Sequence, residues 1–206
     1  MTNVTAGGPV SEVASRKAIL EGRFVDLVAL FPQDLKALYG MVNDIEIAHQ
    51  WRHQGFPPPE DVFMNQFLRS SLMVLGLRSR SGMNLVGFVS AIAADFRHGH
   101  CQVAAMAQRG TRGRGYGAEG AILMIDFIFG SWPFRIVYCE IPEYNFESTY
   151  GTMTRQIRPF MELTLRGTRT WAGREWNTEI LALHRDQWLA IRHTWYRGSI
   201  LTAGEQ

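Results

Sequence analysis

Residues 108–117 read QRGTRGRGYG and form a glycine- and arginine-rich stretch between an apolar strand-like segment and an apolar helix-like segment. Closely spaced glycines leave backbone N–H groups uncovered and allow positive φ angles. A helix that begins directly after such a turn directs the positive end of its dipole toward the turn. The pattern predicts an anion-binding turn. The neighbouring arginines favour a ligand with more than one phosphate, such as a diphosphate-bearing cofactor.

The composition is typical of a single globular domain. The chain has 206 residues, of which 46% are hydrophobic and 12% aromatic, so it can bury a full core. The net charge of +2 is too small to indicate a general surface for nucleic acids or membranes. We expect residues 1–18, which are small and polar, to form a disordered tail, and residues 19–206 to form one domain.

The two cysteines, Cys101 and Cys139, lie within apolar strand-like runs. This placement favours buried free thiols in a reducing compartment over a disulfide framework. The first residues lack a basic region followed by an apolar run, and no apolar run approaches the roughly 20 residues of a membrane helix. We therefore expect a cytoplasmic protein that binds neither membranes nor nucleic acid.

Hydrophobic periodicity predicts strands and helices along the whole chain. The predicted strands are 24–30, 73–78, 85–92, 100–108, 135–141, 160–171 and 176–183. The predicted helices are one beginning at residue 32, then 44–51, 60–70, 118–129 and 145–158, and one beginning near residue 186. Residues 79–82 and 172–174 suit the turns of two antiparallel hairpins. This order indicates a mixed sheet with helices on both faces.

Residues 112–117, RGRGYG, resemble a family signature. They match the R/Q-x-x-G-x-G/A loop with which GNAT-type N-acetyltransferases hold the pyrophosphate of acetyl-CoA. Glu21-Gly22, Glu119 and the run NFES at 145–148 are similar to the branch that acetylates the N-termini of ribosomal proteins. The resemblance covers residues 19–188. It implies the α+β GNAT fold, with a mixed, mostly antiparallel sheet of about seven strands.

The resemblance also implies the ligands and the residues that bind the cofactor. The donor is acetyl-CoA, the acceptor is a small-molecule or peptide amine, and no metal is needed. Tryptophans near the C-terminus are compatible with a homodimer. In the family the strand before the loop is bulged and pairs with the pantetheine arm, and an asparagine after the next strand contacts that arm. The cofactor-binding residues predicted here are Met106, Ala107, Gln108, Arg112, Gly113, Arg114, Gly115, Tyr116, Gly117, Ala118 and Asn145.

Proton transfer is assigned by the same resemblance. Ser148 matches the serine of the branch's N-x-x-S pattern, and its hydroxyl is suited to protonating the departing thiolate. Glu162 matches the glutamate of E-G-x-L-R, although a leucine replaces the glycine, and is suited to taking the amine proton through water. Tyr150 lies two residues before the position of the family's tyrosine acid, where this chain has Thr152. Glu140 is a rival base if its side chain faces the cleft.

Several alternatives remain open from the residues alone. Residues 115–120 also read G-x-G-x-x-G, and Glu140 lies roughly where a ribose-binding acid is expected, as in dinucleotide-binding folds. The run HGHC at 98–101 offers metal-ligand side chains without partners at a recognisable spacing. The functional alternatives are a non-catalytic acyl-CoA-binding or sensor module and a transferase that uses a longer acyl group or a carrier-protein donor.

Overall fold

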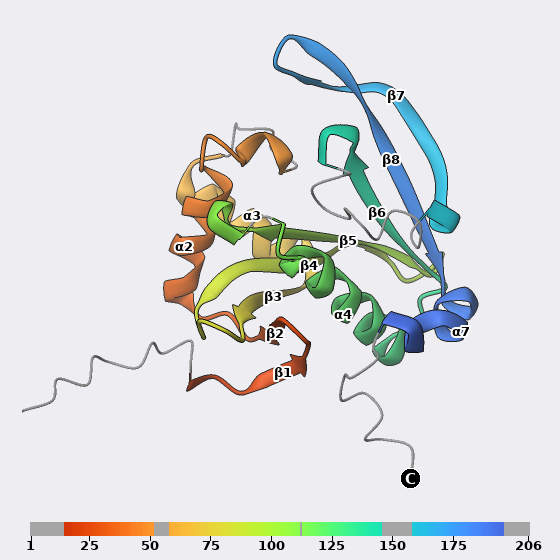
Figure 1. Cartoon of the computed structure of the whole chain (residues 1–206), viewed down its shortest axis with the longest axis horizontal. Coiled ribbons are helices and arrows are strands. Elements are labelled where there is room, and N and C mark those ends of the chain that lie inside the picture. The colour runs from red at the N-terminus through yellow and green to blue at the C-terminus, as the bar shows by residue number, and fades with distance from the viewer. Residues whose placement is uncertain (1–14, 52–57, 112, 146–157, 196–206) are drawn as a thin grey trace, which may run out of the picture.

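The protein is described by a computed structural model that places residues 15–51, 58–111, 113–145 and 158–195 (Figure 1). The elements, with the labels of Figure 1, are β1 (Ala18–Glu21), β2 (Val25–Val28), α2 (Pro32–Val42), η1 (Ala48–Gln50), α3 (Glu60–Arg69), β3 (Ser71–Ser79), β4 (Leu85–Asp95), β5 (His100–Ala107), η2 (Arg109–Thr111), α4 (Tyr116–Ser131), β6 (Ile136–Pro142), η4 (Arg158–Phe160), β7 (Met161–Trp171), β8 (Arg174–His184) and α7 (Arg185–Trp195).

Within the described residues, eight strands form one sheet in the order β1-β2-β3-β4-β5-β6-β8-β7. Neighbouring strands are antiparallel except β5 and β6, which are parallel. This confirms the predicted α+β class and the mostly antiparallel sheet. The strand beyond the expected seven is β1, a four-residue edge strand too short to give a clear periodic pattern. The antiparallel topology excludes a doubly wound dinucleotide-binding fold, whose sheet is parallel.

Helices cover both faces of the sheet (Figure 1). On one face α4 packs in the larger core, which also contains Trp188 of α7. On the other face α2, α3 and the residues around η1 form a second core with Phe88 and Met106. The α4 helix is apolar nearly all round, as predicted, because it is enclosed by the sheet on one side and α7 on the other. The Trp188 indole donates to Asp126 of α4 at 2.9 Å and fixes this packing.

The sheet opens between β5 and β6. These two strands pair only where residues 100–102 face residues 136–138. Beyond this point β5 continues to Ala107 beside β4, while β6 continues to Pro142 beside β8. One edge of β5 therefore lacks a strand partner over residues 103–107, and we call this gap the split.

The described part of the chain includes residues before the boundary expected at residue 18. Arg16 is buried, and its guanidinium contacts Asp34 of α2 at 2.5 Å. The Arg16 carbonyl accepts a hydrogen bond from Arg78 of β3, which also pairs with Asp26 at 2.7 Å. Arg16 thus neutralises a buried carboxylate and is held in place. Residues 1–14 lie outside the described part of the chain.

One other predicted element differs from the structure, and a second lies mostly outside the described residues. The helix expected over 44–51 is reduced to the three-residue 3₁₀ turn η1, although Ile47 and Ala48 both donate to the Asp44 carbonyl. The helix expected over 145–158 falls mostly on residues outside the described ranges. The closing hairpin is confirmed, and its turn residues Ala172 and Gly173 have φ angles of 53° and 74°, as a tight two-residue hairpin turn requires.

Both cysteines are free and buried, as predicted. Burial raises the pKa of each thiol to about 12. In the described part of the chain, no helix is both long and apolar enough to cross a membrane.

Candidate active site

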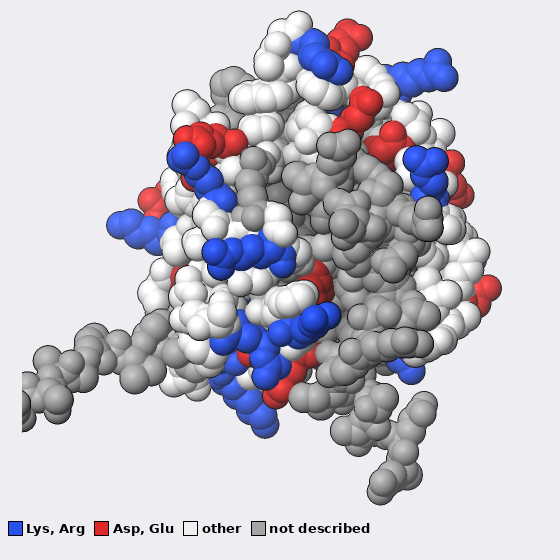
Figure 2. Space-filling view, viewed as in Figure 1, with Lys and Arg blue, Asp and Glu red and all other residues white. Residues whose placement is uncertain are grey.

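The glycine-rich stretch lies at the junction of β5 and α4, as predicted. Gly115 precedes the first turn of α4 with a φ of 75°, a left-handed conformation that other residues adopt only at a cost. A Cβ added at Gly115 would meet nothing within 4 Å, so the space before the helix N-terminus is open. Figure 2 shows Lys and Arg side chains gathered over β1 and β2, near this end of α4. The helix dipole favours an anion here.

The free edge of β5 presents backbone groups to the split. The N–H of Gln108 donates to the Val86 carbonyl on β4 at 2.7 Å. Because alternate residues of a strand direct their backbone groups to opposite sides, Val103, Ala105 and Ala107 present theirs to the split. The small alanine side chains leave this edge accessible to an extended ligand.

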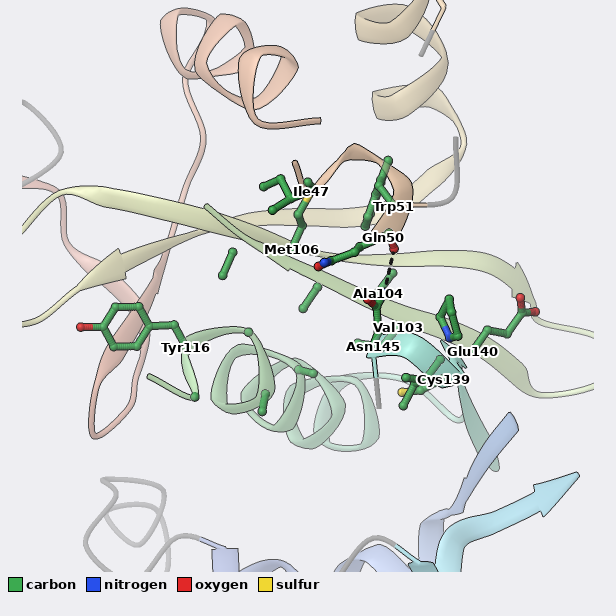
Figure 3. Close-up of a pocket in the computed structure, with 18 of the residues that line it drawn as sticks. Ile47, Gln50, Trp51, Val103, Ala104, Met106, Tyr116, Cys139, Glu140 and Asn145 are labelled. Carbon is green, nitrogen blue, oxygen red and sulfur yellow. Dashed lines mark hydrogen bonds between the residues drawn. The ribbon is translucent and has the colours of Figure 1, made fainter. Parts of the chain in front are cut away.

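A cavity of about 340 Å³ occupies the split beside the N-terminal end of α4 (Figure 3). The predicted cofactor-binding residues line it, with three exceptions. Gln108 is turned toward β4, and its carbonyl accepts from the backbone and the hydroxyl of Thr111. Arg114 is exposed beside the turn and does not line the cavity. Arg112 lies outside the described residues.

The cavity connects the two faces of the sheet. Gly117 and Ala121 of α4 line it on one face, and Ile47 and Trp51 beside η1 line it on the other. Figure 3 places Tyr116 at one end and Glu140 at the opposite end. The split is thus the point at which two ligands from opposite faces of the sheet could meet.

Three polar side chains from three strands meet at the Glu140 end. Gln102 of β5 donates to one carboxylate oxygen of Glu140 at 2.9 Å. Arg169 of β7 approaches the other oxygen at 3.9 Å. The side chains of Arg169 and Glu140 are 19% and 42% exposed, and all three residues line the cavity. The rival base considered from the sequence, Glu140, therefore lies at the border of the cavity.

The other predicted catalytic residues are placed less favourably or not at all. Glu162 lies exposed on β7 and is not among the residues that line the cavity. Ser148 and Tyr150 lie outside the described residues, so their roles stay predictions.

Two residues predicted to contact the cofactor differ in orientation. Asn145 is buried against the cavity, and its amide donates to the Gln50 carbonyl at 3.3 Å (Figure 3). The Tyr116 hydroxyl points away from the cavity and lies 3.5 Å from the Ser81 hydroxyl. Hydrogen bonds with Ser81 and then with Ser79 and Arg114 lower the pKa of Tyr116 to about 8. Tyr116 therefore anchors the turn with its ring and does not direct its hydroxyl into the site.

An aromatic contact joins η1 to the tip of the β7–β8 hairpin. The His49 ring stacks on Trp171 at 4.0 Å between centroids, with an interplanar angle of 6°. Tyr144 donates its hydroxyl to the His49 carbonyl at 2.8 Å, and its ring meets Trp176 edge-on. This contact fixes the hairpin that carries Arg169. No local pattern predicts this contact, because residues 49 and 171 come together only in the tertiary fold.

The histidines at the β4–β5 turn both lie near Asp95. His98 hydrogen-bonds to Asp95 at 2.9 Å, which holds the pKa of this carboxyl below its usual value. The His100 ring nitrogen is 3.9 Å from the same carboxylate. Among the described residues, no group of three or more His, Cys, Asp or Glu side chains is arranged to hold a metal ion.

No protein-family model matches the sequence, and no curated protein sequence matches it. The likeness is found in solved structures. A spermidine N-acetyltransferase from Vibrio cholerae, solved with CoA and spermine, superposes with a TM-score of 0.67 at 15% identity, covering 80% of this chain and 98% of that one. The chain has the GNAT acetyltransferase fold.

Two further structures agree with the GNAT fold. A GCN5-related N-acetyltransferase from Brucella melitensis gives a TM-score of 0.62 at 18% identity, over 93% of this chain and 90% of that one. The Microcin C7 self-immunity acetyltransferase, solved with acetyl-CoA and AMP, gives a TM-score of 0.60 at 12% identity, over 79% of this chain and 93% of that one. At these identities the likeness shows the GNAT fold, and the activity has to be argued from the site.

Proposed function

We propose that the protein is an acyl-CoA-dependent N-acetyltransferase that moves the acetyl group of acetyl-CoA to a primary amine by direct attack in a ternary complex. The observation that carries this proposal is one continuous cavity in the split. It joins the glycine-rich turn at α4 to a carboxylate on the other face of the sheet. A donor and an acceptor held on the two faces would meet at one point, which makes the reaction effectively unimolecular.

The donor is proposed to bind along the α4 side of the cavity. The diphosphate would lie before the N-terminus of α4, against the backbone of residues 113–117, where the amides are uncovered. The pantetheine arm would pair with the free edge of β5 like an added strand, using the N–H groups of Ala105 and Ala107. Asn145 lines the same cavity beside the arm. Direct roles for Gln108, Arg112 and Arg114 stay predictions.

The chemistry requires an uncharged amine, a donor for the thioester oxygen and an acid for the thiolate. Glu140 is the best candidate to receive the acceptor's ammonium and take up its proton, because it is the carboxylate that lines the cavity among the described residues. A backbone N–H on the free edge of β5 is suited to polarising the thioester carbonyl. Protonation of the thiolate by Ser148 or Tyr150 stays a prediction.

The finer parts of the resemblance also stay predictions. They are membership of the ribosomal-protein branch, a peptide acceptor, a homodimer and a cytoplasmic location. The fold likeness includes a spermidine N-acetyltransferase and so does not favour the ribosomal-protein branch.

The test is to mix the purified protein with acetyl-CoA and a panel of amines and follow release of free thiol. We expect amine-dependent release that Glu140→Gln lowers by about 100-fold or more in kcat. Glu162→Gln serves as the comparison: a larger loss there would identify Glu162 as the base. Tight acetyl-CoA binding without thiol release for any amine would instead favour the non-catalytic sensor.

A further inference from the structure

The charges at the far end of the cavity indicate which class of amine the reaction uses. We infer that the acceptor is a small amino acid-like zwitterion, with its ammonium on Glu140 and its carboxylate on Arg169. This inference rests on the proposed function and adds the acceptor class to it.

The Arg169 guanidinium has N–H donors available to bind an anion. Its side chain is 19% exposed and borders the cavity. Its one ion pair among the described residues is the 3.9 Å approach to Glu140, longer than the roughly 2.7–3.2 Å of a hydrogen bond. A guanidinium carries about five N–H donors in a planar fork that matches a carboxylate. A ligand carboxylate would therefore satisfy this group better than Glu140 does.

Glu140 is oriented for a cation at the same place. Gln102 holds one carboxylate oxygen at 2.9 Å, so the other oxygen lies toward Arg169. A simple amine bound there would bring a second positive charge next to Arg169, and like charges at this distance repel. An amine with a carboxylate on a nearby carbon cancels this repulsion and gives each protein charge its own partner.

The same arrangement disfavours polyamines. A polyamine carries several ammonium groups, and each needs a carboxylate or several acceptors when it leaves water. Glu140 is the one acidic side chain among the described residues that line the cavity, and Arg169 stands beside it. This chain shares the GNAT fold with a structure that holds spermine. The charges of its cavity nevertheless favour a different class of acceptor.

In the proposed reaction the ammonium loses one proton, the nitrogen lone pair forms a bond to the acetyl carbonyl carbon, and the nitrogen then loses a second proton. The carbon–sulfur bond breaks with its electron pair on sulfur, and the thiolate takes up a proton. The products are the N-acetyl amino acid, CoA and one released proton. Arg169 takes no part in bond making and acts as a specificity-determining residue.

The test compares matched acceptors that differ in the carboxylate alone. Leucine is assayed against isopentylamine and leucinamide, and phenylalanine against phenethylamine, with spermidine as the polycation. We expect kcat/KM for at least one amino acid to exceed that of its matched amine by about tenfold or more. Arg169→Gln should abolish this preference while leaving the affinity for acetyl-CoA unchanged. Arg166→Gln, an exposed arginine of the same strand, is the control and should retain the preference.

The outcomes separate the inference from the proposed function. Turnover of the matched amines or of spermidine as fast as that of the amino acids overturns the inference and leaves the N-acetyltransferase proposal standing. An amino acid preference that survives Arg169→Gln in a folded variant also overturns it. Acetyl-CoA binding without CoA release for any acceptor overturns both. Calorimetry with the CoA-loaded protein gives a second measurement, which compares the affinities of N-acetyl-leucine and N-isopentylacetamide. N-acetyl-leucine should bind more tightly to the wild type. In Arg169→Gln the two affinities should be equal.

Discussion

Gly117 is the residue at which the donor site can be tested with least disturbance of the fold. It lies in the first turn of α4, its φ is not in the left-handed region, and an added Cβ would meet only the Ala107 methyl group at 4.0 Å. Gly117→Leu should therefore be tolerated, and replacing a helical glycine even favours the helix. The new side chain would occupy the space proposed for the diphosphate. We expect acetyl-CoA affinity to fall by at least about tenfold in calorimetry.

The control for this substitution is Gly130→Leu, at the exposed end of the same helix, where an added Cβ also meets nothing within 4 Å. It should leave acetyl-CoA affinity as in the wild type. Unchanged affinity in a folded Gly117→Leu variant would refute the placement of the diphosphate at this turn.

The two thiols give a residue-scale prediction about pH. Burial raises the pKa of Cys101 and Cys139 from the ordinary 9.0 to about 12, so the folded protein keeps both protons where the unfolded chain loses them. At about pH 8 roughly one thiol in ten thousand is then ionised. We expect neither cysteine to react with iodoacetamide in the native protein and both to react after unfolding in guanidinium, as counted by mass spectrometry.

The raised pKa of the two thiols also determines how the stability of the fold changes with pH. The folded state binds more protons than the unfolded state between about pH 9 and 12, so this contribution to stability is complete below pH 9 and is lost as pH rises through that window. Rapid labelling of either cysteine in the native protein at neutral pH would contradict the burial on which this rests.

Sequence could predict the donor side of the site but not the whole acceptor side. The glycines of residues 113–117 carry a local signal, because their role depends on the backbone between one strand and one helix. Gln102 and Glu140 left a weaker signal as polar residues within apolar strands. Arg169 left none: it reaches the cavity because β7 folds back beside β8 and β8 beside β6, a long-range pairing.

At the scale of elements, Glu119 joins the start of α4 to the turn between β1 and β2. Its carboxylate accepts the backbone N–H groups of Arg23, Phe24 and Val25 at 2.5, 2.8 and 2.9 Å. Glu119→Gln would place an amide donor against these donors. We expect the free energy of unfolding to fall by about 2 kcal/mol, measured by denaturant titration.

The matched control is Glu60→Gln, in the first turn of α3. Both acids lie at a helix N-terminus, so both lose a similar helix-dipole contribution of about 0.3–1 kcal/mol. In the described chain the Glu60 carboxylate accepts no hydrogen bond from another segment. Equal losses in the two variants would show that the Glu119 bonds add nothing to stability beyond the dipole.

Elements whose pattern is local were predicted well, and those set by tertiary contacts were not. The confirmed α4, the β3–β4 hairpin and the β7–β8 hairpin each carry a strong period or turn pattern within a few residues. The helix expected over 44–51 has such a pattern, but Ile47 and Trp51 are buried in the core between α2 and α3, and only a 3₁₀ turn remains. Tertiary packing there overrides local helix propensity.

At the scale of the whole molecule, the split leaves two parts of the sheet joined by a short parallel pairing. Residues 100–102 pair with residues 136–138, and beyond them the cavity separates β5 from β6. A donor that pairs with β5 and also contacts α4 and β6 would bridge these parts. Acetyl-CoA at about 100 times its Kd should raise the free energy of unfolding by about 2.7 kcal/mol, seen as a higher melting temperature.

Hydrogen exchange resolved by residue tests how that bridge is made. The N–H groups of Ala105 and Ala107 face the split, whereas those of Ala104 and Met106 face β4. An arm that adds to β5 as a strand would hydrogen-bond the first pair only. We therefore expect acetyl-CoA to slow exchange at Ala105 or Ala107 well beyond the general slowing that global stabilisation gives to Ala104 and Met106. Uniform slowing over residues 103–107 would mean that the ligand stabilises the fold without pairing with this strand. At the same acetyl-CoA concentration, both the stabilisation and the slowing should be smaller in the Gly117→Leu variant, because its affinity is lower.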